Sequence, residues 1–308
     1  MGTSEESTER QTERINVFLT HGYSFWRHTA VTVASLLEHN NDLDIHIFSD
    51  ASDPYWLGKI QSQCTPTQST VSFHPFDNQL TSDLKNCGYF GLAAYNRLFI
   101  PELFAGKARR LIYFDSDMIV RTSIRELTDI PLDNCALAAV PGFSKRLNLA
   151  KIASLGHGQQ SRYFNAGLLV IDPNRWLEEG IRATCLDFGK RYPERVQLAD
   201  QDMLNYAAAG RYMELPLKWN VVTELFSDLD SDDLENLSLD EIAHLRKNPC
   251  VVHFNGQYKP WHFTYKHPYR TDYLRLRRKL QKRPYISDDF PGVLLSKPLN
   301  YLRRQASR

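Results

Sequence analysis

The 308-residue sequence lacks several features that would place it in a special class of protein. It has no run of about 18 apolar residues, which is the length that a bilayer-spanning helix needs. The polar opening, MGTSEESTERQTERI, contains no apolar segment like that of a signal peptide. We therefore expect residues 1–14 to be a disordered lead-in and the protein to be cytoplasmic.

Cysteine is also scarce. No two of the five cysteines form a CxxC pair, and they stand far apart, at positions 64, 87, 135, 185 and 250. Such spacing indicates neither a zinc site nor a disulfide framework and is typical of reduced thiols in a core. Internal repeats are absent as well. The rest of the composition, 42% hydrophobic and 24% charged, is that of an ordinary globular protein with one large α/β domain or two smaller ones.

The formal net charge of +1 conceals an asymmetry along the chain. Residues 266–308 contain twelve Lys and Arg against three Asp, whereas the remaining 25 Lys and Arg face 33 acidic residues. A basic end on an acidic body indicates an anionic partner at that end. Nucleic acid is not expected to be this partner, because the sequence contains no recognised nucleic-acid-binding fold.

Strand-like and helix-like segments alternate along the first part of the chain. Strand patterns cover residues 15–20, 43–50 and 69–76, and helical patterns cover 25–39 and 53–64. This alternation predicts a mostly parallel sheet with helices on both faces. Further along, we expect helices at 91–104, 176–192 and 201–209, and strands at 108–120, 135–140, 165–172 and 250–254.

Two segments interrupt the alternation. Residues 141–163 form a polar insertion rich in Gly, Lys, Arg and Gln, and we expect an active-site loop there. Residues 226–241 are acidic, and we expect them to form a solvated surface excursion to which we assign no function.

The stretch LIYFDSDMIV sets two aspartates into an apolar run. On a regular strand, Asp115 and Asp117 would share one face, and the carboxyl end of such a strand borders the ligand crevice of a doubly wound sheet. Two carboxylates this close repel each other, and burying them is costly unless a cation lies between them. Because hard oxygen ligands favour Mn²⁺ or Mg²⁺, the pattern indicates a divalent metal site.

Two other interpretations fit this triplet when it is taken alone. A DxD triplet often lies on a solvated turn, although such a turn does not need aliphatic flanks. The same pattern also opens phosphohydrolases of the haloacid-dehalogenase type, in which the first Asp is a nucleophile and the second a general acid. That chemistry needs a later lysine and an acidic pair after a strand, whereas the acidic run SDLDSDDLEN follows no expected strand.

The string VVHFNGQYKPWH adds groups that suit the same site. His253 ends an expected strand and can offer an imidazole nitrogen to a metal. Gly256 lets the backbone approach a ligand closely, and Lys259 is a cation suited to phosphate. Pro260 and Trp261 would fix the turn that directs this lysine. Each residue alone also fits an ordinary core or surface position, but the whole pattern is far less frequent by chance.

A series of sequence blocks resembles a known family, the retaining glycosyltransferases of family 8. In order, the blocks are YNRLFIPELF, LIYFDSDMIV, YFNAGLLVID with the following Trp176, LADQDMLN and VVHFNGQYKPWH. The family includes bacterial lipopolysaccharide galactosyl- and glucosyltransferases and, more distantly, glycogenin. The resemblance implies a single Rossmann-like, nucleotide-sugar-binding α/β domain of the glycosyltransferase A type at residues 15–265, followed by a basic helical extension at 266–308.

The resemblance also implies roles for individual residues. Asp115, Asp117 and His253 match the family's Mn²⁺ (or Mg²⁺) ligands. Asp200 matches the carboxylate that hydrogen-bonds the transferred sugar, and Gln201 matches the residue placed against the reacting face of the anomeric carbon. The residues implied to bind the donor are Thr20, His21, Phe25, Arg97, Ser116, Asn165, Asp200, Gly256 and Lys259.

Among the donor-binding positions, Phe25 would stack on the base and Ser116 would lie near the ribose. Arg97 would lie beside the donor sugar and its phosphate, and Gly256 and Lys259 would hold the diphosphate. The implied donor is UDP-galactose or UDP-glucose, and the implied acceptor is a hydroxyl of a glycan or glycolipid.

Two routes to retention are open at this stage. A glutamine amide is a poor nucleophile, so Gln201 fits a front-face displacement that its carbonyl oxygen supports. Asp202 is the nearest carboxylate and is the candidate for covalent attack, as in retaining glycosidases.

Two family carboxylates are replaced by glycine in this sequence. Gly22 stands where relatives carry an acid that reads the uracil edge, and its loss weakens discrimination between bases. Gly142 stands where relatives carry an aspartate that contacts the donor sugar and the acceptor. These losses leave one alternative open, a catalytically weak pseudoenzyme that binds sugar nucleotides.

The basic end contains the segment YRTDYLRLRRKLQKR. It sets Tyr269, Tyr273, Leu276 and Leu280 at helical spacing, which predicts an amphipathic helix. This helix fits an anionic membrane surface, with the protein at the inner face of the membrane, and it equally fits packing on the domain with its charges solvated.

Overall fold

The structure is a computed structural model that describes residues 14–88, 91–156 and 162–281. Its main sheet has seven strands, in the spatial order β3 (Thr70–Pro75), β2 (Leu43–Ser49), β1 (Ile15–Thr20), β4 (Leu111–Phe114), β7 (Phe164–Ile171), β6 (Leu137–Pro141) and β8 (Met213–Glu214). A second sheet contains β5 (Met118–Val120), β10 (Val251–His253) and β9 (Val221–Val222). Only β7 runs antiparallel to its neighbours in the main sheet. The predicted mixed, mostly parallel α/β fold is confirmed.

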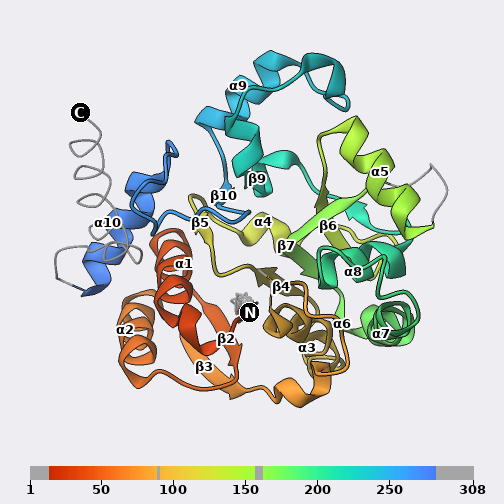
Figure 1. Cartoon of the computed structure of the whole chain (residues 1–308). Coiled ribbons are helices and arrows are strands. Elements are labelled where there is room, and N and C mark those ends of the chain that lie inside the picture. Colours follow the sequence, from red (N-terminus) through yellow and green to blue (C-terminus); the bar gives the residue numbers. More distant parts are fainter. Residues whose placement is uncertain (1–13, 89–90, 157–161, 282–308) are drawn as a thin grey trace, which may run out of the picture.

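Helices pack on both sides of the main sheet (Figure 1). The first core contains residues of α1 (Trp26–His39), α2 (Pro54–Cys64) and α10 (Arg270–Gln281). The second contains residues of α3 (Ile100–Leu103), α5 (Lys145–Leu155), α6 (Pro173–Glu178), α7 (Ile181–Arg191) and α8 (Asp200–Ala208). The other helices are α4 (Arg125–Thr128) and α9 (Leu239–Lys247) and the short 3-10 turns η1 (Tyr23–Phe25), η2 (Thr65–Thr67), η3 (Asn78–Thr81), η5 (Leu92–Leu98), η6 (Leu217–Trp219), η7 (Thr223–Phe226) and η8 (Ser231–Asp233).

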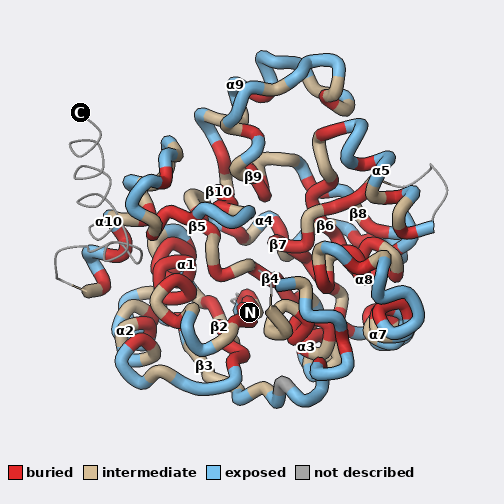
Figure 2. Tube along the Cα trace, in the orientation of Figure 1, coloured by how far each residue is buried: buried red, intermediate tan, exposed pale blue. Residues whose placement is uncertain are grey.

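Successive residues of the central strands point to opposite cores, because strand side chains alternate between the two faces of a sheet. In β1, Val17 and Leu19 belong to the first core and Phe18 to the second. In β4, Ile112 belongs to the first core and Tyr113 to the second. In Figure 2 the strands β4, β6 and β7 at the centre are mostly buried, whereas α2, α7 and α9 at the edge carry many exposed residues. Apolar residues on both faces explain why these strands read as continuous hydrophobic runs.

The single strand predicted for residues 108–120 is wrong in one respect. The chain forms β4 and β5 on either side of Asp115 and Asp117, and the two strands belong to different sheets. β4 pairs with β1 and β7, whereas β5 pairs with β10. Two adjacent carboxylates would be unsatisfied inside a continuous buried ladder. The turn between the strands instead places them where the two sheets meet.

The active-site loop predicted for residues 141–163 is also wrong over much of its length. Residues 145–155 form α5, in which the Ser144 hydroxyl accepts a hydrogen bond from the Leu147 N–H and Gly156 ends the helix at φ 84°. A hydroxyl acceptor at the start and a left-handed glycine at the end are standard helix boundaries. Residues 157–161 lie outside the described residues.

The acidic segment predicted as a solvated excursion packs against α5 at its centre. The Asp233 carboxylate accepts hydrogen bonds from the Ser144 hydroxyl at 2.5 Å and from the Arg146 N–H at 2.8 Å. Leu234 next to it is buried and pairs with Ser144 in an isolated β-bridge. The segment is therefore a mostly exposed excursion, as predicted, that is held to α5 at its centre.

α10 forms as predicted and packs on the domain. Its residues Tyr273, Leu276 and Leu280 are buried in the first core, next to α1. Arg275 donates hydrogen bonds of 2.8 and 2.7 Å to the two carboxylate oxygens of Glu38 on α1. The apolar face is therefore in use within the molecule. The predicted lead-in, up to residue 13, and residues 282–308 lie outside the described residues.

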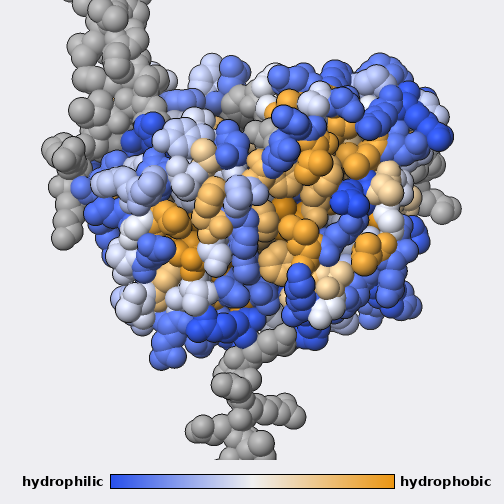
Figure 3. All heavy atoms as spheres, turned by 90° about the horizontal axis from the view of Figure 1, so that it is seen from below, coloured by the Kyte–Doolittle hydropathy of each residue, from blue (hydrophilic) through white to orange (hydrophobic). Residues whose placement is uncertain are grey.

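The outer surface is mixed in character. Seen from below, hydrophobic residues form a band across a face whose edges are hydrophilic (Figure 3). Leu80 and Leu103 are among the large apolar side chains that are more than half exposed. None of the helices that the structure describes is both long and apolar enough to cross a bilayer.

Candidate functional site

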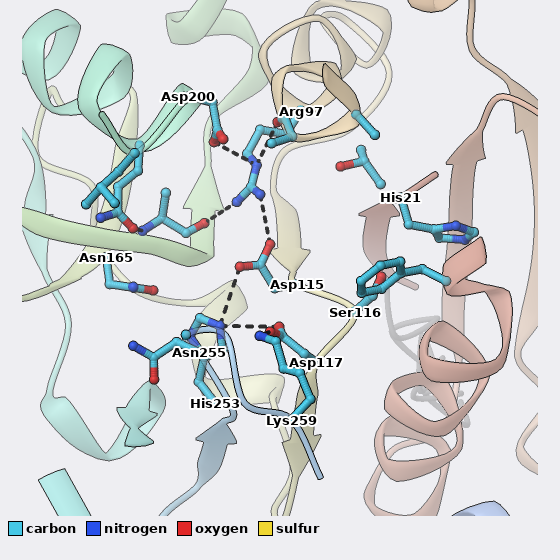
Figure 4. A pocket seen from close by; sticks show the side chains of 18 of the residues that line it. His21, Arg97, Asp115, Ser116, Asp117, Asn165, Asp200, His253, Asn255 and Lys259 are labelled. Atoms are coloured by element: carbon cyan, nitrogen blue, oxygen red, sulfur yellow. Dashed lines mark hydrogen bonds and ion pairs between the residues drawn. The ribbon is translucent and has the colours of Figure 1, made fainter. Parts of the chain in front are cut away.

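A pocket of about 360 Å³ opens at the carboxyl ends of β1 and β4. The residues around it come from distant parts of the sequence, and the side chains of Arg97, Asp115 and Asp200 point towards one another in Figure 4. Its lining contains every predicted metal ligand and every predicted donor-binding residue: Thr20, His21, Phe25, Arg97, Asp115, Ser116, Asp117, Asn165, Asp200, His253, Gly256 and Lys259. Gln201 also lines the pocket, whereas Asp202 is not among its lining residues.

Asp115, Asp117 and His253 form a compact cluster of potential metal ligands. One ligand atom from each lies within 4.8 Å of the others. His253 Nε2 is 3.6 Å from Asp115 Oδ2 and 3.3 Å from Asp117 Oδ1. Atoms bound to a common Mn²⁺ at about 2.0–2.2 Å would have comparable separations. Two carboxylates and an imidazole are also ligand types that this ion accepts.

The orientation of His253 is fixed by residues that the sequence analysis did not identify. His253 Nδ1 lies 3.0 Å from the amide oxygen of Asn220, which can only accept, so Nδ1 donates to Asn220 and Nε2 is the ring nitrogen that faces the two carboxylates. Asn220 in turn donates to the amide oxygen of Asn165 at 2.8 Å. A Cβ on Gly167 would lie 2.5 Å from the His253 ring, so only glycine leaves room for the imidazole there.

Arg97 links the carboxylates of Asp115 and Asp200. Its guanidinium lies 2.9 Å from Asp115 Oδ1 and 2.8 Å from Asp200 Oδ2, and it donates to the Ala166 carbonyl at 2.7 Å. The guanidinium also stacks over the Tyr113 ring at 4.2 Å. An arginine this well buried, with partners on every side, is a fixed positive charge facing the pocket.

Asp200 is held at the start of α8 by an unusual backbone. The preceding Ala199 has φ 48° and ψ −127°, a conformation that costs a non-glycine residue free energy and is found most often at functional sites. Burial raises the pKa of Asp200 to about 7, although Arg97 opposes this shift. The carboxylate is therefore kept next to the pocket at a cost in free energy.

Lys259 supplies a second cation. Its ammonium group donates a short hydrogen bond to Asp117 Oδ2 and another of 2.7 Å to the Phe254 carbonyl. Burial alone would raise the pKa of Asp117, but Lys259 and His253 together hold it well below its ordinary value. Asp117 is therefore ionised, and it faces both an imidazole and an ammonium group.

The model of the family described as glycosyl transferase family 8 matches residues 16–265 of this chain. The chain belongs to this family. Membership identifies it as an enzyme, a hexosyltransferase of family 8, and excludes the haloacid-dehalogenase interpretation. The interpretation of the DxD triplet as a solvated turn is also wrong, because both aspartates line the pocket.

Curated proteins and solved structures of this kind are similar to the chain over most of its length. General stress protein A of Bacillus subtilis is 27% identical over 82% of this chain and 88% of its own. Lipopolysaccharide 1,3-galactosyltransferase of Salmonella typhimurium is 24% identical over 80% of this chain and 73% of its own. The galactosyltransferase LgtC, solved with donor and acceptor sugar analogues, superposes with a TM-score of 0.75 at 19% identity, over 90% of this chain and 99% of its own. The fold predicted as glycosyltransferase A type is thereby confirmed.

Gln201 and Asp202 occupy different environments in this family 8 chain. Gln201 accepts a hydrogen bond from the Ala166 N–H at 3.0 Å and donates to the Tyr163 hydroxyl at 3.1 Å, with its side chain at the pocket wall. The Asp202 carboxylate is fully buried and accepts from the Tyr163 hydroxyl and from the N–H groups of Gln197 and Leu198. The structure therefore does not bring Asp202 to the pocket, and its contacts are those of a structural residue.

Several other residues bring polar groups to the pocket. His21 Nε2 is buried and has no hydrogen-bond partner among the described residues. Ser116 accepts from the Thr29 hydroxyl at 2.9 Å. Glu224 and Asn255, which the sequence analysis missed, are joined by hydrogen bonds of 2.9 and 2.7 Å. Glu224 lies outside the motif blocks, so only the fold brings it to the site, whereas Asn255 stands within the block VVHFNGQYKPWH, next to Gly256.

The two glycines that replace family carboxylates differ in their surroundings. Gly22 lines the pocket, and a Cβ there would meet only the Ala93 side chain, at 3.9 Å. A Cβ on Gly142 would lie 2.4 Å from the amide oxygen of Asn148 and 3.2 Å from the Tyr163 carbonyl. The chain therefore has space for a side chain at position 22, whereas Asn148 fills that space at position 142.

Proposed function

We propose that this family 8 enzyme transfers a hexose, with retention of configuration, from a nucleotide diphosphate sugar to a hydroxyl of a glycan or glycolipid. The proposed donor is UDP-galactose or UDP-glucose, and the proposed cofactor is Mn²⁺ or Mg²⁺. The convergence of Asp115, Asp117 and His253 next to Lys259 and Arg97 is the observation that carries this proposal.

Departure of the diphosphate requires positive charge where negative charge develops. Asp115, Asp117 and His253 would hold the divalent ion, which supplies Lewis-acid stabilisation of that leaving group when bound. Lys259 lies next to these ligands and would contact the diphosphate directly, as the left-handed Gly256 (φ 83°) lets the backbone approach closely. The ammonium group of Lys259 donates a hydrogen bond to Asp117, one of these ligands.

The sugar would lie towards Arg97, Asp200 and Gln201. Arg97 holds Asp200 at 2.8 Å, so that its carboxylate is oriented for the sugar hydroxyls and for the positive charge that develops on the ring. The position of Asp202 outside the pocket favours front-face displacement over a covalent intermediate on that residue. Gln201 then supports the reacting face as a polar, uncharged group.

A screen of nucleotide sugars by thermal stabilisation tests the proposal. With Mn²⁺ present, one sugar nucleotide at 100 times its Kd raises the free energy of unfolding by about 2.7 kcal/mol. Asp117→Ala abolishes the metal-dependent part of this shift. The matched control, Asp129→Ala, changes a carboxylate that is 74% exposed and leaves the shift unchanged. A shift that is independent of Mn²⁺ and unaffected by Asp117→Ala would contradict the site assignment.

Turnover distinguishes this enzyme from the pseudoenzyme alternative. The wild-type chain with Mn²⁺ slowly hydrolyses its donor, and NMR of the first sugar released shows the anomeric configuration of the donor. A pseudoenzyme would bind and release the donor intact. A first product of inverted configuration would exclude the retaining mechanism.

A further inference from the structure

The turn at residues 259–262 is bound directly by the first residue of α10. Arg270 donates from Nε to the Pro260 carbonyl at 3.1 Å and from Nη2 to the His262 carbonyl at 2.9 Å. Two parallel donors on one planar guanidinium fix both the position and the orientation of a turn. The turn therefore depends on a side chain that follows it in the basic extension.

A stack of aromatic rings holds the same turn from its other side. Trp261 is buried, and its ring stacks on His28 of α1 with the centroids 3.6 Å apart and the planes at 18°. His28 Nδ1 is hydrogen-bonded at 2.7 Å to the hydroxyl of Tyr273 on α10. Phe25, at the pocket wall, contacts the Trp261 ring edge-on at 5.9 Å. α1 and α10 together thus enclose the turn.

The lysine of the pocket begins at this turn. The Lys259 N–H donates to His262 Nδ1 at 3.2 Å, which closes the turn on itself. Its side chain then runs to the Phe254 carbonyl and to Asp117, and only 4% of that side chain is exposed. A buried lysine of fixed stem has its ammonium position set by its backbone, so a displaced turn would move the charge away from the metal ligands.

From these contacts we infer that α10 is a positioning element of the site, in which Arg270 and Tyr273 place the Lys259 ammonium group for the diphosphate. This inference rests on the proposed function, because it takes Lys259 to bind the diphosphate. The basic extension then has a role within the domain, separate from any role of its charge at a surface.

A double-mutant cycle on UDP binding tests the coupling. UDP affinity is measured by calorimetry with saturating Mn²⁺ for the wild-type chain, Lys259→Met, Arg270→Met and the double variant. Removing a charge-assisted contact to the diphosphate weakens UDP binding roughly 10- to 100-fold in Lys259→Met. Arg270→Met weakens it about 3- to 10-fold in the wild-type background but less than about 2-fold when Lys259 is absent, because residues that act through one another are not additive.

Two further variants exclude a general loss of structure. Tyr273→Phe keeps the ring and removes only the hydroxyl that reaches His28. It lowers UDP affinity less than Arg270→Met does, and this loss also depends on the presence of Lys259. Arg275→Met lies on the same helix, is 55% exposed and pairs with Glu38, and it leaves UDP affinity unchanged. Melting temperatures of all variants show whether Arg270→Met remains folded. If it does not, the UDP affinities of Tyr273→Phe with and without Lys259→Met decide the question.

The outcomes separate this inference from the proposed function. UDP binding that is lost in Lys259→Met but unaffected by Arg270→Met and Tyr273→Phe overturns the inference alone. If Arg270→Met lowers UDP affinity equally with and without Lys259, the inference is overturned too, because Arg270 then has a merely structural role. A wild-type chain that binds no UDP, or binds it equally without Lys259, overturns the proposed function and the inference with it.

Discussion

At the residue scale, His253 receives its orientation from a neighbour that would never touch the ion. Asn220 accepts from Nδ1 at 3.0 Å and thereby leaves Nε2 as the ring nitrogen that faces the two carboxylates. Neighbours of this kind typically change metal affinity 10- to 100-fold. We predict that Asn220→Ala weakens Mn²⁺ binding by about 10-fold in a titration by calorimetry, while Asn248→Ala, at an exposed position, has no effect. Unchanged affinity in Asn220→Ala would show that the imidazole is held without this contact.

The two glycines at family carboxylate positions give a second prediction. Gly22→Asp places a carboxylate at the pocket, where there is space for it and where φ is −79°. One added hydrogen bond to a base edge is worth about 1–3 kcal/mol, so preference for UDP over CDP rises by about 5- to 150-fold. Competition between the two nucleotides in a binding assay measures this ratio. A ratio that stays at the wild-type value would place the base elsewhere.

Gly142→Asp is the matched comparison and should behave differently. Its Cβ would meet the Asn148 amide and a backbone carbonyl, so the variant loses stability before it gains any sugar contact. A lower melting temperature for Gly142→Asp than for Gly22→Asp is the expected result.

At the element scale, most strands and helices could be predicted from alternation and helical spacing, and the exceptions have physical reasons. The break between β4 and β5 has no signal in the continuous apolar pattern, since it depends on the pairing of β5 with β10 more than 130 residues later. α5 has exposed leucines, Leu147 and Leu149, and only a weak apolar face. Its contacts with Asp233 and Glu235, about 87 residues away, stabilise it, and no local pattern contains them.

The same limit applies to the site. His253 and Lys259 could be found because they belong to a dense motif. Asn220 and Glu224 could not, because isolated polar residues carry no periodicity, and only the fold brings Glu224 to the pocket and Asn220 to His253. Asn255 stands within that motif, but nothing in the pattern separates it from its neighbours.

The basic extension allows a prediction about its two parts. A chain ending at Pro268 loses α10 and exposes the surfaces that Tyr273, Leu276 and Leu280 cover, each worth about 1.5–3 kcal/mol of burial. A chain ending at Gln281 retains α10 and loses only residues 282–308, with six Lys and Arg and two Asp. We predict that the longer chain melts at a clearly higher temperature than the shorter one.

Sedimentation with anionic vesicles tests the membrane contact that the sequence of the basic extension leaves open. The chain ending at Gln281 binds such vesicles more weakly than the full chain, and added salt reduces the difference, because the attraction is electrostatic. Equal binding of both chains would exclude residues 282–308 from a membrane contact.

At the scale of the whole molecule, two histidines, the buried His21 and the half-buried His267, make stability depend on pH. Burial lowers the pKa of His21 to about 4, and burial in an aromatic cluster lowers that of His267 to about 4. Between pH 6.5 and 4 the unfolded chain therefore binds more protons than the folded one, and the free energy of unfolding falls as the pH falls. Each such group contributes at most about 1.4 kcal/mol per pH unit in this window.

Urea unfolding at pH 7.5, 6 and 5 measures this slope. His267→Asn keeps an acceptor near the position of Nδ1, which accepts from the Tyr269 N–H at 3.1 Å, and removes the titrating ring. We predict that the free energy of unfolding of this variant falls less steeply than that of the wild-type chain below pH 6.5. Above pH 6.5 we expect the two to change in parallel. An identical slope below pH 6.5 would show that His267 titrates normally in the folded protein.

The three expected ligands of the ion stand on both of the molecule's sheets. Asp115 follows the last residue of β4 in the larger sheet, whereas Asp117 and His253 border β5 and β10 in the smaller one. A bound cation would consequently join two separately hydrogen-bonded sheets. Its affinity would therefore depend on how well the two sheets are aligned. Shortening the side chain of Val252, which is buried in β10 next to His253, would then weaken binding of the ion in a titration, although this side chain is not a ligand.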